Sequence, residues 1–166
     1  RTRAETLLAE GRSRAVECWL LALPGPVRAA DGWLAYWLAR CRLPYDPGQA
    51  RTSFEAAYAY FGEAGDAKGL YLSWAGVIDT FTYEWGDFSR VDPWVKELDR
   101  LRARHPRYPS QEIETHVTVG MLAALTWRFP GDPALSEWAA RAMRIVIESA
   151  GSQLSVVLGG HLVFYS

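Results

Sequence analysis

Apolar residues recur at helical spacing over most of the chain, and this periodicity restricts the possible folds more than any other feature. The clearest example, spaced i, i+4, i+7, i+8, i+11 and i+15, is Leu70, Trp74, Val77, Ile78, Phe81 and Trp85. Such spacing places the side chains on one face of an α-helix. The segments 46–63, 110–128 and 133–149 carry similar patterns. No segment alternates convincingly like a strand, although 156–158 and 162–165 are short enough to stay ambiguous.

Aspartates mark the boundaries between these helices. Asp46 and Asp132 each precede a proline, which joins an N-cap to the residue favoured at the first helical position. Asp66 and Asp87 each follow a glycine (Gly86 in the second case), so one helix can end and the next begin within a few residues. Connections this short predict that successive helices pack antiparallel.

The spacing of these boundaries indicates a repeat. Asp46, Asp87 and Asp132 are 41 and 45 residues apart, and Gly11 lies 35 residues before Asp46. Each interval can hold two helices, which is typical of an α-solenoid. We therefore predict an all-α fold of about 7–8 helices, with antiparallel pairs stacked as a short tetratricopeptide-like solenoid. A compact helical bundle is the alternative.

We expect these pairs to form a single domain, 1–166. Its expected units lie near 1–26 (partial), 28–63, 66–104, 110–149 and 152–166 (partial). The chain opens on arginine rather than methionine, and we expect it to be a piece of a longer protein.

The glycine-rich stretch 62–69, Gly-Glu-Ala-Gly-Asp-Ala-Lys-Gly, raises the question of a phosphate-binding loop. A Walker loop lies between a strand and a helix, and its lysine follows the last glycine and precedes serine or threonine. Here Lys68 precedes Gly69, and a helix comes first. We interpret the stretch as a turn between helices, in which Gly65 ends one helix, Asp66 caps the next and Gly69 permits close helix packing.

Composition argues against several classes of function. The net charge is −1 and the arginines are scattered, so no global field attracts nucleic acid or a membrane surface. Cys18 and Cys41 lack the spacing of a zinc site or a disulfide framework, and we expect free, buried thiols, with a single bridge as the alternative. Without a signal peptide or a run long enough to span a bilayer, the sequence predicts a cytoplasmic protein that needs no cofactor.

Several stretches together resemble a known family. They are Trp33-Leu-Ala-Tyr-Trp-Leu-Ala-Arg, Asp46-Pro-Gly-Gln-Ala-Arg, Phe54-Glu-Ala-Ala-Tyr-Ala-Tyr-Phe-Gly-Glu-Ala-Gly-Asp and Gly69-Leu. They resemble the tetratricopeptide-type helical region of MalT-like, LuxR-family ATP-binding transcriptional regulators of bacteria. The resemblance covers residues 10–104 well and 105–166 only through continued helix pairing, and the units here are longer and looser than strict repeats. It implies a segment that receives a signal and passes it to neighbouring domains.

Candidate catalytic and metal-binding groups are sparse. Glu112 and His116 share a helix face and could supply two metal ligands, but no third ligand is near in sequence, so we interpret them as a surface pair. No nucleophile motif is present. A hydrolase would need Asp79, His116 or Glu112 to converge. His105, in Arg-Ala-Arg-His-Pro-Arg, suits a helix C-terminus better than a nucleic-acid patch. We predict neither enzyme activity nor a metal site.

Aromatic residues are abundant, with eight Trp, eight Tyr and six Phe. We expect one group to pack between helices: Trp74, Trp85, Trp94 and Trp138. A second group lies off or at the edge of the apolar stripes, where aromatic rings on the concave face of a solenoid can bind a ligand or anchor a partner. Small residues on that face, including Gly76, could leave a groove. The candidate binding residues are Tyr36, Trp37, Ser73, Thr80, Tyr83, His116 and Trp127.

These observations favour a non-enzymatic sensor or interaction module of a bacterial transcriptional or signalling regulator. It would bind a small effector or a protein partner on a concave aromatic surface, and its partners would include neighbouring domains of the same chain. We expect no direct contact with nucleic acid and none with a membrane. The alternative is a structural scaffold or self-association module without a small-molecule ligand.

Overall fold

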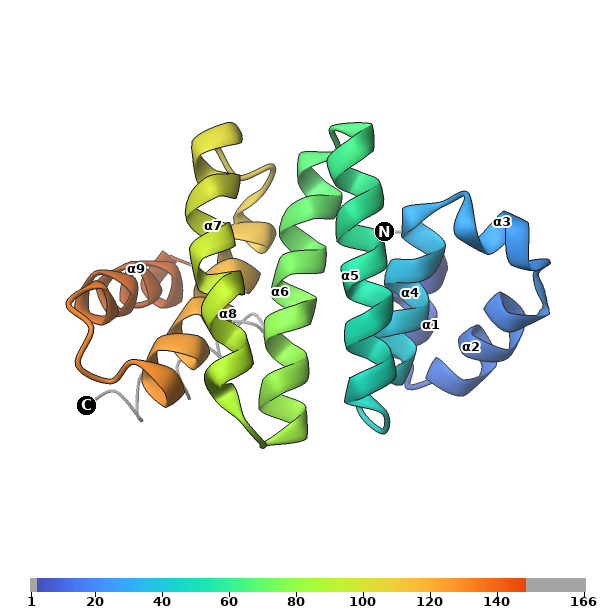
Figure 1. Cartoon of the computed structure of the whole chain (residues 1–166), viewed down its shortest axis with the longest axis horizontal. Helices are drawn as coiled ribbons and strands as arrows, with labels where there is room; N and C mark the ends of the chain where they lie inside the picture. Colours follow the sequence, from blue (N-terminus) through green and yellow to red (C-terminus); the bar gives the residue numbers. More distant parts are fainter. Residues whose placement is uncertain (1–2, 149–166) are drawn as a thin grey trace. The chain divides into compact units, whose positions relative to one another are not determined.

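The computed structural model describes residues 3–148, and this part of the chain is entirely helical (Figure 1). It contains nine α-helices and one 3₁₀ helix, η1. In chain order they are α1 (Arg3–Ala9), α2 (Ser13–Ala22), α3 (Gly25–Ala29), α4 (Gly32–Arg42), α5 (Pro47–Ala64), α6 (Ala67–Glu84), η1 (Phe88–Val91), α7 (Asp92–Arg104), α8 (Gln111–Arg128) and α9 (Ala134–Glu148). The all-α prediction is confirmed for these residues. The predicted partial unit 152–166 lies outside them.

The chain divides into two compact units, Arg1–Glu84 and Trp85–Ser166. The division falls inside the predicted pair 66–104, so α6 and α7 belong to different units. We call these parts unit 1 and unit 2. The stacking of all helix pairs into a single solenoid stays a prediction.

The aspartates cap helices as the sequence predicts. Gln49 N–H donates to Asp46 Oδ1 at 3.0 Å, Gly69 N–H to Asp66 Oδ1 at 3.0 Å, and Ala134 N–H to Asp132 Oδ1 at 2.8 Å. Asp87 accepts from Ser89 N–H at 2.8 Å and begins η1 instead of an α-helix. These side chains satisfy backbone donors that the first helical turn leaves without partners.

The stretch 62–69 is the turn between α5 and α6. Gly65 follows α5 in the left-handed conformation, with φ of 70°, and α6 begins at Ala67 after the Asp66 cap. A Cβ atom at Gly69 would lie 2.3 Å from the ring of Phe61. The absent side chain therefore lets α5 and α6 pack closely side by side, as expected (Figure 1).

Unit 1 is built around this α5–α6 contact, with α4 packed against both helices. Its largest fully buried side chains, with at most 1% exposure, include Phe54, Phe61, Leu70, Trp74 and Ile78. The apolar stripe read from 70 to 81 is therefore the core face of α6. Gly76 lies beneath Phe54, where a Cβ atom would meet the ring at 2.5 Å. The predicted groove at Gly76 is wrong, because Phe54 fills that space.

Unit 2 has its own core. Leu98 and Leu101 of α7, Leu122 and Leu125 of α8, and Trp138 of α9 are all buried. The first residue of α7 is tied to the end of α8, because Arg128 donates two hydrogen bonds to Asp92, at 2.8 and 3.1 Å. This bidentate pair fixes the geometry of the unit more firmly than a single contact would.

Two packing predictions are wrong. Trp85 is 61% exposed, because it follows the end of α6 and has a positive φ of 49°, where Gly86 was the expected turn residue. Cys18 is a free and exposed thiol, since α2 buries only Val16 among its residues. Cys41 is free and buried as expected, and burial raises the pKa of its thiol to about 11.

Candidate functional site

Two of the predicted binding residues, Ser73 and Thr80, are fully buried in the α6 face that packs on α5. Thr80 Oγ1 donates to the Val77 carbonyl at 2.6 Å and accepts from Arg51 Nε at 2.9 Å. Their placement on an open surface is wrong, because the small residues of α6 serve the approach of α5. Thr80 is instead the anchor of a buried arginine.

That arginine, Arg51 of α5, is almost completely buried. It forms an ion pair with Glu84 near the end of α6, and its guanidinium lies 4.0 Å from the centre of the Phe81 ring. Together with Thr80, these groups offset the charge of Arg51 and accept two of its hydrogen bonds. The arrangement joins α5 to α6.

Tyr36 is also buried, at 4% exposure, rather than at the edge of an apolar stripe. Its ring is the centre of an aromatic cluster, 5.6 Å from Trp33, 5.0 Å from Trp37 and 5.6 Å from Phe54, each in an edge-on geometry. Edge-on rings are favourable because of the aromatic quadrupole. Tyr36 therefore supports neighbouring side chains and does not itself form a binding surface.

A charged pair lies beside this cluster, where α4 adjoins α6. Arg40, one turn after Tyr36, donates a hydrogen bond to the Tyr36 hydroxyl. The negative charge of Asp79 on α6 favours the charged form of Arg40. Burial lowers the pKa of Arg40, but Tyr36 and Asp79 outweigh it and the net shift is upward. Burial raises the pKa of Asp79 to about 6, and Arg40 opposes this shift. Both charges are partly buried, and each favours the charged form of the other.

Two further predicted residues accompany this pair. Tyr83 is 56% exposed and lies near enough to Arg40 to contribute to its raised pKa. Trp37 is half-buried, one turn before Arg40 on α4. We call the surface formed by Trp37, Arg40, Asp79 and Tyr83 the α4–α6 face. It combines two aromatic side chains with one donor and one acceptor of opposite charge.

The remaining predicted residues belong to unit 2. His116 is half-buried on α8. Trp127, at the end of α8, is partly exposed, and its ring lies 4.7 Å from that of Trp85 in an edge-on geometry. Glu112 is exposed on the same helix as His116. Within residues 3–148, no three potential metal-ligating side chains gather in one place.

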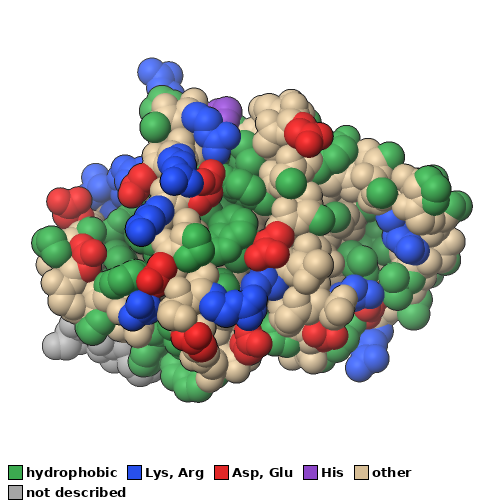
Figure 2. Space-filling view, in the orientation of Figure 1, with side chains coloured by type: hydrophobic (Ala, Val, Ile, Leu, Met, Phe, Trp, Pro, Cys, Tyr) green, Lys and Arg blue, Asp and Glu red, His purple; other side chains and the backbone are tan. Residues whose placement is uncertain are grey.

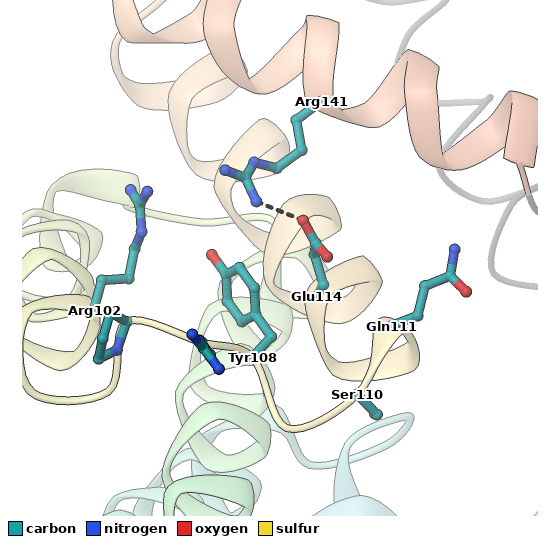
Figure 3. A pocket seen from close by; sticks show the side chains of 8 residues that line it. Arg102, Tyr108, Ser110, Gln111, Glu114 and Arg141 are labelled. Carbon is teal, nitrogen blue, oxygen red and sulfur yellow. Dashed lines mark hydrogen bonds and ion pairs between the residues drawn. The ribbon is translucent and has the colours of Figure 1, made fainter.

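Unit 2 also contains an open cavity of about 530 Å³ that the sequence did not reveal (Figure 3). Its polar lining residues are Arg102, Arg107, Tyr108, Ser110, Gln111, Glu114 and Arg141. The basic residues within 102–107 were the sequence feature that could have indicated this cavity. They were instead interpreted as basic residues at a helix C-terminus. Arg141 comes from α9, and no local pattern places it there. We call this cavity the arginine pocket.

Charge on the face drawn in Figure 2 is mixed. Figure 2 shows basic side chains gathered around α7, with acidic ones among them. Of the acids, Glu97 pairs with Arg100 at 3.1 Å and with Arg104 at 3.0 Å.

None of the helices described here combines the length and the apolar character that crossing a membrane requires.

Comparisons with known proteins found no match: no family model, no curated protein and no solved structure matches the chain. The resemblance to MalT-like regulators therefore stays a prediction from residues 10–104.

Proposed function

We propose that the chain is a non-enzymatic interaction module whose α4–α6 face binds a segment of a partner protein. One observation carries the proposal: Tyr83 is 56% exposed beside the partly buried Arg40–Asp79 pair. Exposed tyrosines next to a held arginine are typical of residues that dominate protein interfaces.

The chemistry of the face suits a polypeptide. Arg40 can donate to backbone carbonyls and Asp79 can accept from backbone amides, while Trp37 and Tyr83 offer apolar area with few rotatable bonds. Because Arg40 is already hydrogen-bonded to Tyr36, binding would order little that is mobile at this side chain in the free protein.

The resemblance to MalT-like regulators suggests what such binding would serve. If the chain is part of a regulator of this kind, the α4–α6 face would receive a signal from a partner or a neighbouring domain in the bacterial cytoplasm. A bound segment would favour one arrangement of the helices and shift the state of attached domains.

The proposal is tested by selecting phage-displayed peptides on the whole chain and measuring the affinity of the enriched peptides by calorimetry. Tyr83→Ala should weaken their binding at least about tenfold, as loss of an interface anchor does. The matched control is Tyr60→Ala on α5, which removes another partly exposed tyrosine outside the face and should change affinity less than about twofold. Melting temperatures of both variants report whether each is folded. Failure to enrich any peptide, or equal losses in both variants, would contradict the proposal.

A second candidate function is self-association, which one observation favours. Trp19 is 53% exposed and lines an open apolar groove of about 480 Å³ between α1 and α2, with Leu7, Val16, Leu20 and Leu23. A second copy of the chain could cover this surface. Sedimentation of the wild type over a range of concentrations should then show a dimer that Trp19→Arg converts to monomer. A wild type that stays monomeric throughout would exclude this function.

A further inference from the structure

The arginine pocket is lined by three arginines from three parts of unit 2. Arg102 lies in the last turn of α7, Arg107 in the following loop, and Arg141 on α9. The volume of about 530 Å³ lies in the range of sites that hold small organic molecules. The pocket belongs to unit 2, so it is independent of the α4–α6 face.

The positive charge of the pocket exceeds its negative charge. Glu114 is the only carboxylate among its described lining residues, and it accepts a hydrogen bond from Arg141 Nη1 at 2.5 Å. Within the described part of the chain, neither Arg102 nor Arg107 forms an ion pair with a carboxylate. The lining therefore carries two positive charges in excess, and its field attracts anions.

Two of these cations lie against the same buried indole, Trp138. The guanidinium carbons of Arg102 and Arg141 each lie 5.4 Å from the centre of the Trp138 ring. Arg141 also lies 5.8 Å from the ring of Tyr108. Cation–π attraction favours these positions but leaves the repulsion between two like charges. An anion bound in the pocket would offset that repulsion.

Tyr108 adds a neutral donor to the pocket. Figure 3 shows its ring between Arg102 and Arg141, with the hydroxyl directed toward the space between the two side chains. Burial raises the pKa of Tyr108, although Arg102 and Arg141 act in the opposite direction. The phenol therefore keeps its proton at neutral pH and does not compete with an incoming anion for the arginines.

We propose that the arginine pocket binds a small organic molecule that bears a phosphate group. A phosphate monoester carries a charge of about −1.5 to −2 at pH 7, which matches the excess of the lining. Guanidinium groups present paired N–H donors that fit phosphate oxygens, and three arginines line the pocket. The cavity is larger than a phosphate group needs, and Pro106, Tyr108 and Gln111 bound the space left for the organic part.

Calorimetry on the whole chain tests this proposal with adenosine monophosphate, glucose 6-phosphate, inorganic phosphate and citrate as probes. We expect at least one organic phosphate to bind with a Kd on the order of 0.1 mM, more tightly than inorganic phosphate or citrate. Its affinity should fall as salt is raised. Adenosine and glucose, which lack the phosphate, should give no binding heat.

Variants locate the site. Arg102→Gln and Arg107→Gln should each weaken binding of the best phosphate probe about tenfold, because each removes a charged donor. The matched control is Arg100→Gln, which changes the net charge equally on the same helix but outside the pocket, and should stay within about twofold. Arg107 is exposed in a loop, so we expect its substitution to leave the fold intact. A loss of binding in Arg107→Gln would therefore report on the pocket and not on unfolding.

Three results would overturn the proposal. The first is no binding heat from either organic phosphate at concentrations up to roughly 10 mM. The second is an equal loss in Arg100→Gln and Arg107→Gln, which would show a general charge effect. The third is citrate binding as tightly as the phosphates, which would assign the pocket to carboxylates. None of these results affects peptide binding at the α4–α6 face, so the two proposals fail separately.

Discussion

Arg51 and Arg40 of unit 1 and Arg102 of the arginine pocket have the same side chain but opposite surroundings. Arg51 has Glu84, Thr80 and the Phe81 ring around it, and Arg40 has Asp79 and Tyr36. In unit 2, Arg102 has an aromatic ring as its partner and no carboxylate. An arginine is compensated here when a carboxylate offsets its charge, and such an arginine can join two helices. An uncompensated arginine, which has no carboxylate partner, keeps N–H donors for a ligand when it lines a cavity.

The largest expected effect concerns a compensated arginine. Arg51→Met should lower the free energy of unfolding by about 2–4 kcal/mol, because it removes buried hydrogen bonds and a cation–π contact together. Arg102→Met, the same change at an uncompensated arginine, should cost less than about 1 kcal/mol. Urea unfolding followed by circular dichroism compares the two. Equal losses would show that compensation does not distinguish these arginines.

A somewhat smaller effect is expected for the pH dependence of Asp79. Its folded pKa of about 6 lies above the value of about 4 in an unfolded chain, so the folded state binds the proton more tightly. The stability that Asp79 contributes is therefore present below pH 4 and is lost as the pH rises to 6.

Asp79→Asn removes this titration. Relative to the variant, the wild type should lose about 1–3 kcal/mol of stability between pH 4 and pH 7. Urea unfolding of both proteins at several pH values measures the difference. Parallel profiles would mean that Asp79 does not titrate near 6 in the folded protein.

Local signals in the sequence were sufficient for the helices and their caps. Asp46, Asp66 and Asp132 act within three residues of themselves, and the close contact of Gly69 follows from its place in the turn. The burial of Thr80 was not predictable, because the hydrophobic pattern does not say that Arg51, 29 residues earlier, needs a partner inside the α5–α6 contact.

The α4–α6 face and the arginine pocket also differed in how far local sequence patterns could predict them. Tyr83 was identified because a large aromatic residue lay outside the apolar stripe, which is a property of one helix. The arginine pocket was missed because it depends on how α7 and α9 pack around Trp138. Arg102 and Arg141 come together only through that tertiary contact, so neither carries a local signal.

A third prediction concerns the carboxylate of the pocket. Glu114→Gln removes its negative charge and should strengthen binding of adenosine monophosphate about three- to tenfold, since the lining gains one further excess positive charge. Calorimetry measures the change, with Glu112→Gln on the exposed side of α8 as the matched control. Weaker binding in Glu114→Gln would contradict a pocket governed by charge excess.

The smallest expected effect lies in the α5–α6 contact. Ser73 Oγ is buried and finds no hydrogen-bond partner among the described residues, so Ser73→Ala should leave the free energy of unfolding unchanged or raise it by up to about 1 kcal/mol. Thr80→Val at the same interface should instead lower it by about 1–3 kcal/mol, because a buried Arg51 donor loses its acceptor. The opposite ranking in urea unfolding would reverse these assignments.

We propose that the excess of arginine over carboxylate in the arginine pocket marks a phosphate site of this chain. To test this, the side-chain Nε–H resonances of all arginines are followed by NMR as the whole chain is titrated with adenosine monophosphate. We expect saturable shifts at Arg102, Arg107 and Arg141, with Arg40 and Arg51 unmoved. Shifts that fall on Arg40 and Arg51, or that spread over all exposed arginines without saturating, would contradict it.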